Sequence, residues 1–296
     1  MTTLTASPAS LPFELGEPHS FRGLTVVPLF PTVDCKLEYL GLDEALAGGL
    51  SVTEATESGD VNSLLLQNPL DERVLLYEGE ELVGAKQNRI VERTVLVEAK
   101  TVIALPVSCV ERGRWAYRSR SFSSAPRAAY PDLRRAQAAH REAGAQAMVW
   151  ANVAERASLH DAFSPTEAAE ELYVSREPTL EEYAQELPRV EGQGGALVAY
   201  SGSLSCLDYV GRSDVFAGLY AKLLRGYALE AVEHDEARPL RKTDVSRFLR
   251  AVAAAERRLV ESAGSGIESR FEGGVLGSEL SAFGELVALT AYAAAA

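Results

Sequence analysis

Two polar segments interrupt apolar, strand-like stretches of the chain, and they hold the residue types best suited to chemistry. The first, residues 77–89, has seven charged or amide side chains among its thirteen residues, YEGEELVGAKQNR. Alternation along an extended strand places Glu78 and Glu80 on the same face. A turn after these acids would bring Lys86 or Arg89 back towards them. We expect a polar cluster here; a solvent-exposed hairpin with surface ion pairs is the alternative.

The second polar segment, residues 106–115, reads PVSCVERGRW. Cys109 and Glu111 lie two residues apart, so a strand would place them on one face. A nucleophilic cysteine needs a neighbouring base or positive field that lowers the thiol pKa. Arginines nearby could supply that field, but the segment has no histidine, so we favour a core or site-lining role for the cysteine. Trp115 beside Arg114 could stack on a ring or base, and a core tryptophan is the alternative.

A third segment, residues 202–211, reads GSLSCLDYVG and contains the isolated acid Asp208. This segment lacks the GxGxxG and GxxxxGK[ST] patterns, so it predicts neither a dinucleotide fold nor a phosphate-binding P-loop. Asp208 is a candidate for ligand binding, with a turn or cap role as the alternative. The four histidines are scattered, and the strand-like runs over residues 74–118 have none, so we predict no metal centre of the cupin type.

Composition excludes several classes of protein. The 296 residues are 47% hydrophobic and 24% charged, with a net charge of −13, which excludes collagen, a coiled coil and a mostly disordered chain. Three widely spaced cysteines predict no disulfide framework and no structural zinc, and they are typical of the reducing cytoplasm. The start of the chain lacks the pattern of a signal peptide, and no apolar run is long enough for a membrane helix. The acidic balance argues against general coating of nucleic acid.

Charge is unevenly distributed along the chain. Residues 112–141 hold eight arginines against one acid, and residues 155–191 hold ten acids against three arginines. The two stretches could neutralise each other within the fold. Alternatively, the arginines form a local anion site, because the planar guanidinium binds phosphate with two parallel hydrogen bonds.

The first half of the chain has the spacing of an antiparallel β structure. Short strand-like runs recur about every 8–12 residues, with glycine turns and a proline inside one run, which is typical of a sandwich or barrel of the jelly-roll type. These runs are residues 21–30, 50–56, 62–68, 74–83, 89–99 and 101–110, with a further candidate at 114–118.

The second half is predominantly helical. The alanine-rich stretch 132–157 predicts a helix, and capping patterns at Ser164, Thr179, Ser213 and Asp244 predict four more. A hairpin is predicted from residues 196–200 and 204–209, which flank a Ser-Gly-Ser turn. Strand character returns over residues 267–292.

These patterns predict an α+β fold, in which an antiparallel sandwich-like or barrel-like N-terminal half packs with a helical C-terminal half that carries the hairpin and the terminal strands. Residues 1–18 are expected to form a flexible arm. We expect residues 19–296 to form a single domain, strand-rich over 19–130, helix-rich over 131–265 and ending in strands over 266–293.

The polar segments also carry a family resemblance. GEELVGAKQNR followed by PVSCVERGRW, together with residues 195–231, resembles the ARG-and-rhodanese-phosphatase-superfamily-associated protein domain, and the resemblance extends from about Phe21 to Tyr292. The family name implies association with ADP-ribosylglycohydrolases and phosphatase-like proteins but specifies no reaction. Matching positions are Glu78, Gly79, Glu80, Gly84, Lys86, Gln87, Arg89, Pro106, Ser108, Cys109, Glu111, Gly113 and Trp115.

From this resemblance we expect one pocket that binds, or also processes, an ADP-ribose-like or other nucleotide-derived anion. Its acids would hold ribose hydroxyls or act as general acid and base, its cations would neutralise phosphate, and its tryptophan would stack on the base. The candidate catalytic residues are Glu78, Glu80 and Glu111. The candidate ligand-binding residues are Lys86, Gln87, Arg89, Cys109, Arg114, Trp115 and Asp208. If these acids hold a metal, their oxygens would favour Mg²⁺ or Mn²⁺ over zinc.

Two other functions are compatible with the sequence. A non-enzymatic interaction module could use arginines of residues 112–141 to bind an acidic partner, with nucleic acid less favoured because of the net charge. A redox protein that acts through Cys109 is the third hypothesis. We expect no membrane association and make no prediction of oligomeric state.

Overall fold

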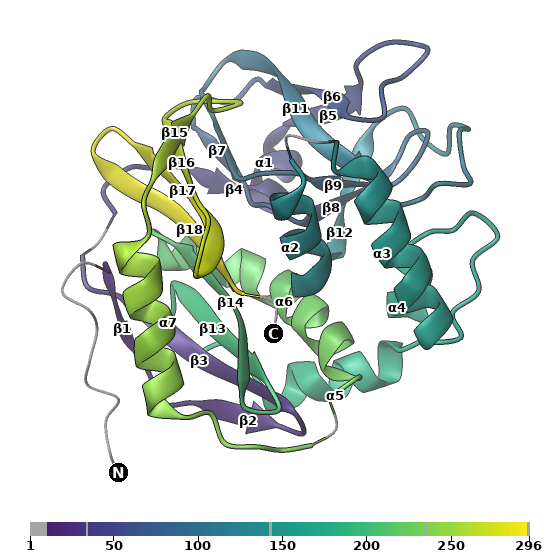
Figure 1. Cartoon of the computed structure of the whole chain (residues 1–296). Coiled ribbons are helices and arrows are strands. Elements are labelled where there is room, and N and C mark those ends of the chain that lie inside the picture. Colours follow the sequence, from purple (N-terminus) through teal and green to yellow (C-terminus); the bar gives the residue numbers. More distant parts are fainter. Residues whose placement is uncertain (1–10, 34, 142–143, 235, 295–296) are drawn as a thin grey trace. The chain divides into compact units, whose positions relative to one another are not determined.

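The computed structural model describes residues 11–33, 35–141, 144–234 and 236–294, and the chain forms two compact units (Figure 1). Unit 1 comprises Met1–Leu37, Glu182–Ser262 and Gly266–Ala296, and unit 2 comprises Glu38–Glu181 and Ala263–Ser265. The single domain that we predicted over residues 19–296 spans both units. Strands from both ends of the chain share one sheet, and the segment between them forms sheets and a core of its own.

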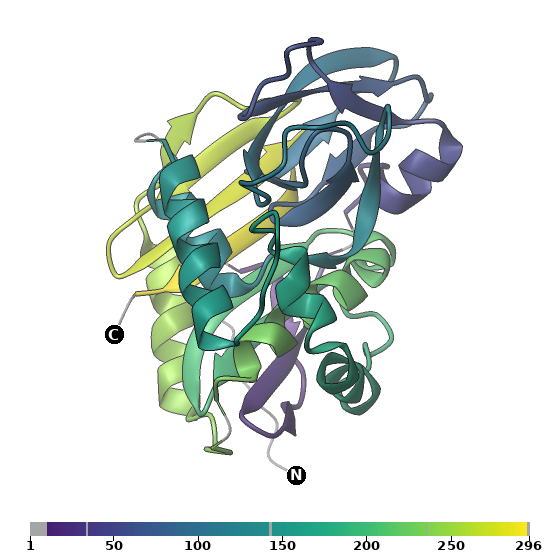
Figure 2. The same cartoon turned by 90° about the vertical axis from the view of Figure 1, so that its right-hand side faces the viewer.

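Unit 1 is built on a nine-stranded antiparallel sheet of order β1-β3-β13-β14-β18-β17-β16-β15, with β2 also paired to β3. Figure 2 shows β16, β17 and β18 side by side in this sheet. The strands are β1 (Phe13–Leu15), β2 (His19–Phe21), β3 (Leu24–Pro31), β13 (Gly195–Tyr200), β14 (Ser203–Val210), β15 (Arg258–Val260), β16 (Ile267–Phe271), β17 (Val275–Ala282) and β18 (Glu285–Ala293).

The helices α6 (Ser213–Ala231) and α7 (Lys242–Ala254) also belong to unit 1, and α5 (Glu177–Glu186) contains the boundary between the units. Apolar side chains recur on one face of α7 and pack against alternate residues of the sheet. Phe248 and Val252 of the helix share a core with Leu197 and Leu207 of the central hairpin.

Unit 2 has a six-stranded sheet, β12-β8-β9-β11-β6-β5, and a three-stranded sheet, β10-β7-β4. Both sheets contribute to one hydrophobic core, as the sandwich-like prediction requires, and the mixture of helices with antiparallel sheets confirms the α+β class. The strands are β4 (Leu40–Gly41), β5 (Ser51–Glu54), β6 (Ser63–Asn68), β7 (Val74–Leu76), β8 (Glu80–Gly84), β9 (Arg89–Val91), β10 (Val95–Val97), β11 (Thr101–Cys109) and β12 (Phe122–Ala128), and the helices are α1 (Leu42–Gly48), α2 (Pro131–Ala139), α3 (Gln146–Leu159) and α4 (Glu170–Val174).

Several local predictions need correction. The predicted strand over residues 89–99 is two strands, because β9 pairs in the six-stranded sheet and β10 pairs in the three-stranded one. Residues 114–118 form a loop, and the unpredicted strand β12 follows it. The predicted arm through residue 18 includes β1, which pairs with β3; residues 1–10 of that arm lie outside the described residues.

The capping patterns gave the right helices at approximate positions, with one exception. No helix begins at Ser164, whose hydroxyl instead accepts a hydrogen bond from the Ala168 backbone N–H within a turn. Glu167 has a φ of 52°, a left-handed conformation that a continuing α-helix does not allow, and α4 begins at Glu170. The hairpin across Ser-Gly-Ser is confirmed, with β13 paired to β14.

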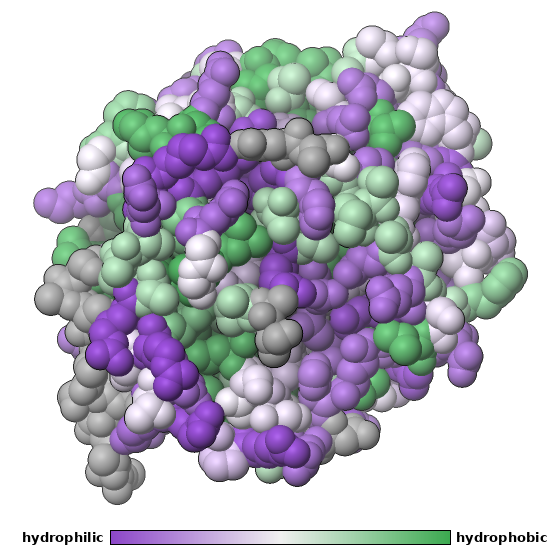
Figure 3. Space-filling view, in the orientation of Figure 1, coloured by the Kyte–Doolittle hydropathy of each residue, from purple (hydrophilic) through white to green (hydrophobic). Residues whose placement is uncertain are grey.

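The face drawn in Figure 3 has hydrophilic residues interspersed with smaller hydrophobic areas. Among the described residues, no helix combines the length and hydropathy that crossing a membrane requires.

Candidate functional site

Three loops of unit 2 converge around the two polar segments: residues 55–62, 85–88 and 110–121. The Lys86 backbone N–H donates to Glu54 Oε1 at 3.1 Å, which joins the first loop to the second. Gln87 Nε2 donates to the Glu111 carbonyl at 3.0 Å, which joins the second to the third. Hydrogen bonds that span 32 and 24 residues of the sequence therefore hold the three loops together.

The loop between β8 and β9 is held in an unusual conformation. Gly84 has a φ of 127° and Ala85 a φ of 35°, a region that residues with a Cβ rarely adopt. The Ala85 carbonyl accepts hydrogen bonds from Arg114 Nη1 at 2.7 Å and from the Arg118 backbone N–H at 2.9 Å. These bonds fix the loop that positions Lys86.

Glu111 is fully buried, and its carboxylate is surrounded by donors. It accepts hydrogen bonds from Arg114 Nη2 at 2.7 Å, the Asn88 backbone N–H at 3.0 Å and Thr166 Oγ1 at 2.9 Å. Burial alone would raise the pKa of Glu111, but these donors outweigh burial and lower the pKa below its ordinary value. Glu111 is thus a charged group that ties three segments together.

Arg89 is the unusual cation of this region. Its side chain is fully buried, and only Nη1 is hydrogen bonded, to Gln87 Oε1 at 2.9 Å and to the Asn88 carbonyl at 3.4 Å. Nε and Nη2 have no hydrogen-bond partner among the described residues. Burial lowers the pKa of Arg89, although a guanidinium keeps its proton at neutral pH. One edge of a buried guanidinium is therefore left without acceptors.

Aromatic and charged side chains surround this arginine. The Arg89 Cζ atom lies 5.7 Å from the centroid of the Trp115 ring, and Lys86 Nζ lies 5.2 Å from the same ring and 5.1 Å from that of Tyr117. Lys86 Nζ also donates to the Glu57 carbonyl. Trp115 and Tyr117 are 46% and 54% exposed, so their rings remain accessible.

Glu54, which the sequence analysis did not single out, contributes a second unsatisfied group. Its Oε1 accepts the Lys86 N–H, whereas its buried Oε2 has no hydrogen-bond partner in the described part of the chain. The charges of Glu54 and Arg89 are close enough to affect the pKa of the arginine. We call Glu54, Lys86, Gln87, Arg89 and Trp115 the Arg89 cluster.

Cys109 lies beside this cluster as a buried thiol. Its backbone exchanges two hydrogen bonds with the Gln146 side chain, at 2.7 and 2.9 Å, which anchors the end of β11 to α3. Burial raises the pKa of Cys109, and the nearby Arg89 charge only partly opposes this effect. A protonated, buried thiol is a poor nucleophile, which argues against the hypothesis of a redox protein that acts through Cys109.

Glu78 and Glu80 lie at the opposite end of β8 from the loop that bears Lys86. Glu78 Oε2 pairs with Arg141 Nη2 at 2.8 Å, and Glu80 Oε2 accepts the Tyr77 backbone N–H at 2.8 Å. Glu111 instead lies beside the loop that bears Lys86. The three acids predicted as catalytic therefore do not come together. Only Glu111 borders the Arg89 cluster.

Four of the eight arginines of residues 112–141 have buried side chains, and Arg112, Arg118 and Arg120 are exposed. Arg127 makes two hydrogen bonds to Glu81, at 2.6 and 2.9 Å, and an ion pair with Glu170 at 3.3 Å. Some of the arginines pair with acids of residues 155–191, which is one of the alternatives given above. Others pair with acids of residues 78–111. The arginines whose side chains are buried are Arg114, Arg127, Arg134 and Arg141.

Asp208 belongs to unit 1, whereas the residues of the Arg89 cluster belong to unit 2. It is fully buried and accepts a hydrogen bond from the Tyr227 hydroxyl at 2.5 Å, which links β14 to α6. Within the described residues, no group of three or more His, Cys, Asp or Glu side chains is placed to hold a metal ion.

Fold and site together define an α+β protein with a buried, incompletely paired cation in its second unit. The chain belongs to the ARG and Rhodanese-Phosphatase-superfamily-associated Protein domain family, whose model matches residues 12–292. The match includes both polar segments and all residues of the Arg89 cluster. No curated protein and no solved structure matches the chain.

Proposed function

We propose that unit 2 binds an ADP-ribose-like or other nucleotide-derived anion at the Arg89 cluster. The observation that carries this proposal is the unsatisfied edge of Arg89. Nε and Nη2 lie on the same side of the planar guanidinium, and this pair of donors matches two oxygens of a phosphate or carboxylate. Leaving such donors buried without acceptors costs free energy, which a bound anion would recover.

Neighbouring groups match the other parts of such a ligand. The exposed ring of Trp115 offers a stacking surface for a base, and Lys86 adds a second positive charge. Glu54 Oε2 is a free acceptor for a sugar hydroxyl. A phosphate, a ribose and a base would each have a partner within one cluster.

The proposal concerns binding rather than turnover. Glu111, the predicted acid nearest to Arg89 in the fold, already accepts hydrogen bonds from three donors and has a lowered pKa, so it is poorly suited to transfer a proton near neutral pH. Glu78 and Glu80 lie at the end of β8 that is remote from Lys86, and both acids are already bonded within the fold.

A thermal-shift panel on the full chain tests the proposal. ADP-ribose, AMP, ribose 5-phosphate and inorganic phosphate are compared, and a ligand at 100 times its Kd adds about 2.7 kcal/mol to the unfolding free energy. Arg89→Lys, which keeps the charge but loses the fork, is expected to abolish the shift. Lys100→Met is the matched control, because Lys100 is an exposed cation of unit 2 that pairs with Asp71.

Two results would overturn the proposal: a flat panel, or a shift of equal size in the wild type and in Arg89→Lys. Short single-stranded DNA and RNA in the same panel address the interaction-module alternative. Binding of these polyanions that Arg118→Gln and Arg120→Gln abolish, while Arg89→Lys does not, would favour the module, because both residues are exposed.

A further inference from the structure

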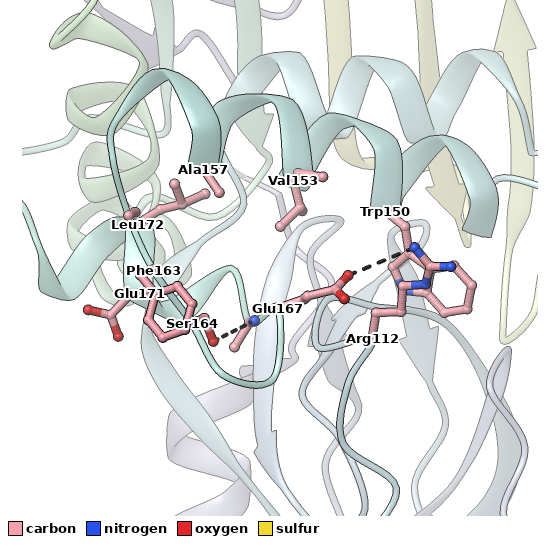
Figure 4. Close-up of a pocket in the computed structure, with 12 residues that line it drawn as sticks. Arg112, Trp150, Val153, Ala157, Phe163, Ser164, Glu167, Glu171 and Leu172 are labelled. Carbon is pink, nitrogen blue, oxygen red and sulfur yellow. Dashed lines mark hydrogen bonds and ion pairs between the residues drawn. The ribbon is translucent and has the colours of Figure 1, made fainter.

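Helix α3 and the segment of residues 162–172 line a cavity in unit 2, of about 290 Å³ (Figure 4). Small side chains on α3, Ala154 and Ala157, leave this space open, and Val153 and Leu172 add to an apolar wall. Cavities that hold small molecules are mostly apolar and measure roughly 300–1,000 Å³, so this one is at the small end of the range.

The charged residues of the cavity are distributed unequally between its ends (Figure 4). At one end, Arg112 lies over the Trp150 ring at 5.2 Å and pairs with Glu167 at 3.8 Å. At the other end, Glu171 lies beside Phe163, whose ring is 81% exposed. No cation among the described residues pairs with Glu171. The lining therefore has one carboxylate that is not neutralised.

We propose that this cavity binds a small molecule with an apolar, aromatic body and a single ammonium group. The aromatic body would remove the apolar wall of α3 from water, which is the main source of affinity for such a ligand. The ammonium would pair with Glu171 and lie near the face of Phe163, an arrangement that stabilises cations. An anionic analogue would be repelled by Glu171, and Arg112 is already paired with Glu167.

The two tryptophans of the chain allow the cavity to be observed separately. Trp150 lines the cavity and Trp115 belongs to the Arg89 cluster, so Trp115→Phe leaves Trp150 as the only tryptophan. Phenethylamine titrated into this full-length variant is expected to change the fluorescence in a saturable way. 2-Phenylethanol, which lacks the charge, should bind more weakly, and 3-phenylpropionate should not bind.

Variants separate the contributions of charge and space. Glu171→Gln is expected to weaken phenethylamine binding about fivefold, the upper range for a partly exposed ion pair. Glu155→Gln removes an equal charge from the exposed side of α3 and should leave the affinity unchanged. Ala157→Leu fills the cavity without changing charge and should abolish binding.

Three results would overturn the assignment. They are the absence of any saturable change, equal affinity for phenethylamine and 3-phenylpropionate, and unchanged affinity in Glu171→Gln. Sedimentation tests a different occupant: a dimer that Phe163→Ala dissociates would mean that a second copy of the chain covers the cavity. Arg89→Lys should not alter phenethylamine binding, so this test is independent of the proposed nucleotide site.

Discussion

Arg89 and Arg114 are both buried in unit 2, yet we predict opposite effects when each is replaced by methionine. Arg114 donates five hydrogen bonds through Nη1 and Nη2, one of them to the buried carboxylate of Glu111. Removing one partner of a buried ion pair typically costs 3–5 kcal/mol, because the other charge stays buried and unpaired. We therefore expect Arg114→Met to lower the unfolding free energy by roughly 3–5 kcal/mol.

Arg89 has a different balance. Each of its two unsatisfied nitrogens carries a desolvation cost of roughly 1–3 kcal/mol, which Arg89→Met removes. The same substitution leaves Gln87 Oε1 without its donor, at a similar cost of roughly 1–3 kcal/mol, and it removes the longer hydrogen bond to the Asn88 carbonyl. We expect Arg89→Met to be stabilising by about 1 kcal/mol in the absence of ligand, on the balance of these terms.

Urea unfolding followed by tryptophan fluorescence measures both effects, because Trp115 and Trp150 both lie in unit 2. Equal slopes of unfolding free energy against urea would show that the variants unfold from comparably compact states. The reasoning is refuted if Arg89→Met destabilises unit 2 as much as Arg114→Met does. That result would mean that Arg89 is a structural cation whose edge is satisfied in solution.

Three further outcomes follow from the geometry. The lowered pKa of Glu111 contributes stability above the ordinary carboxyl pKa of 4.5 that is lost as the pH falls through the folded-state pKa, so Glu111→Gln should cost more unfolding free energy at pH 7 than at pH 3. Iodoacetamide at pH 7.5 should label the partly exposed Cys35 before the buried Cys109. Mass spectrometry of the native chain measures the two labelling rates. Equal rates would contradict the argument from burial. Gly79→Ala should lower the urea midpoint, with a cost in unfolding free energy of roughly 1–3 kcal/mol. The new Cβ would lie 2.3 Å from Cδ of the buried Arg134, and the φ of residue 79 is 85°. A midpoint equal to that of the wild type would show that Arg134 moves freely.

Much of the fold was predicted from turns, helix caps and strand alternation, because these patterns depend on residues that are close in the sequence. The Ser-Gly-Ser turn fixed the hairpin of β13 and β14, since Gly202 supplies the positive φ, here 79°, that a tight turn needs. The alternation over residues 89–99 was also real, but alternation does not say which sheet a strand joins. The turn at residues 92–94 moves the chain from one sheet to the other, and only the pairing of β10 with β7 shows it.

The candidate site was predictable where its residues are close in sequence and not where strand pairing assembles it. Lys86, Gln87 and Arg89 occupy one loop and strand start, so the polar segment itself drew attention to them. Glu54 is 32 residues from Lys86 and reaches it only because β5 lies in the same sheet as β8. Asp208 was included as an isolated acid on a predicted hairpin strand, and in the fold it belongs to the other unit.

The distinction between Arg89 and Arg114 shows why composition could not identify the site. Both arginines are buried, and the sequence does not distinguish between them as phosphate-binding residues. The fold gives Nη1 and Nη2 of Arg114 a carboxylate and four other acceptors, so its charge holds the loops in place, and of its three nitrogens only Nε lacks a partner among the described residues. Arg89 has acceptors on Nη1 alone within the part of the chain that the structure describes. Since buried donors are normally satisfied, an arginine that the surrounding loops hold rigidly but leave unpaired on one edge is preorganised for an acceptor from outside the chain.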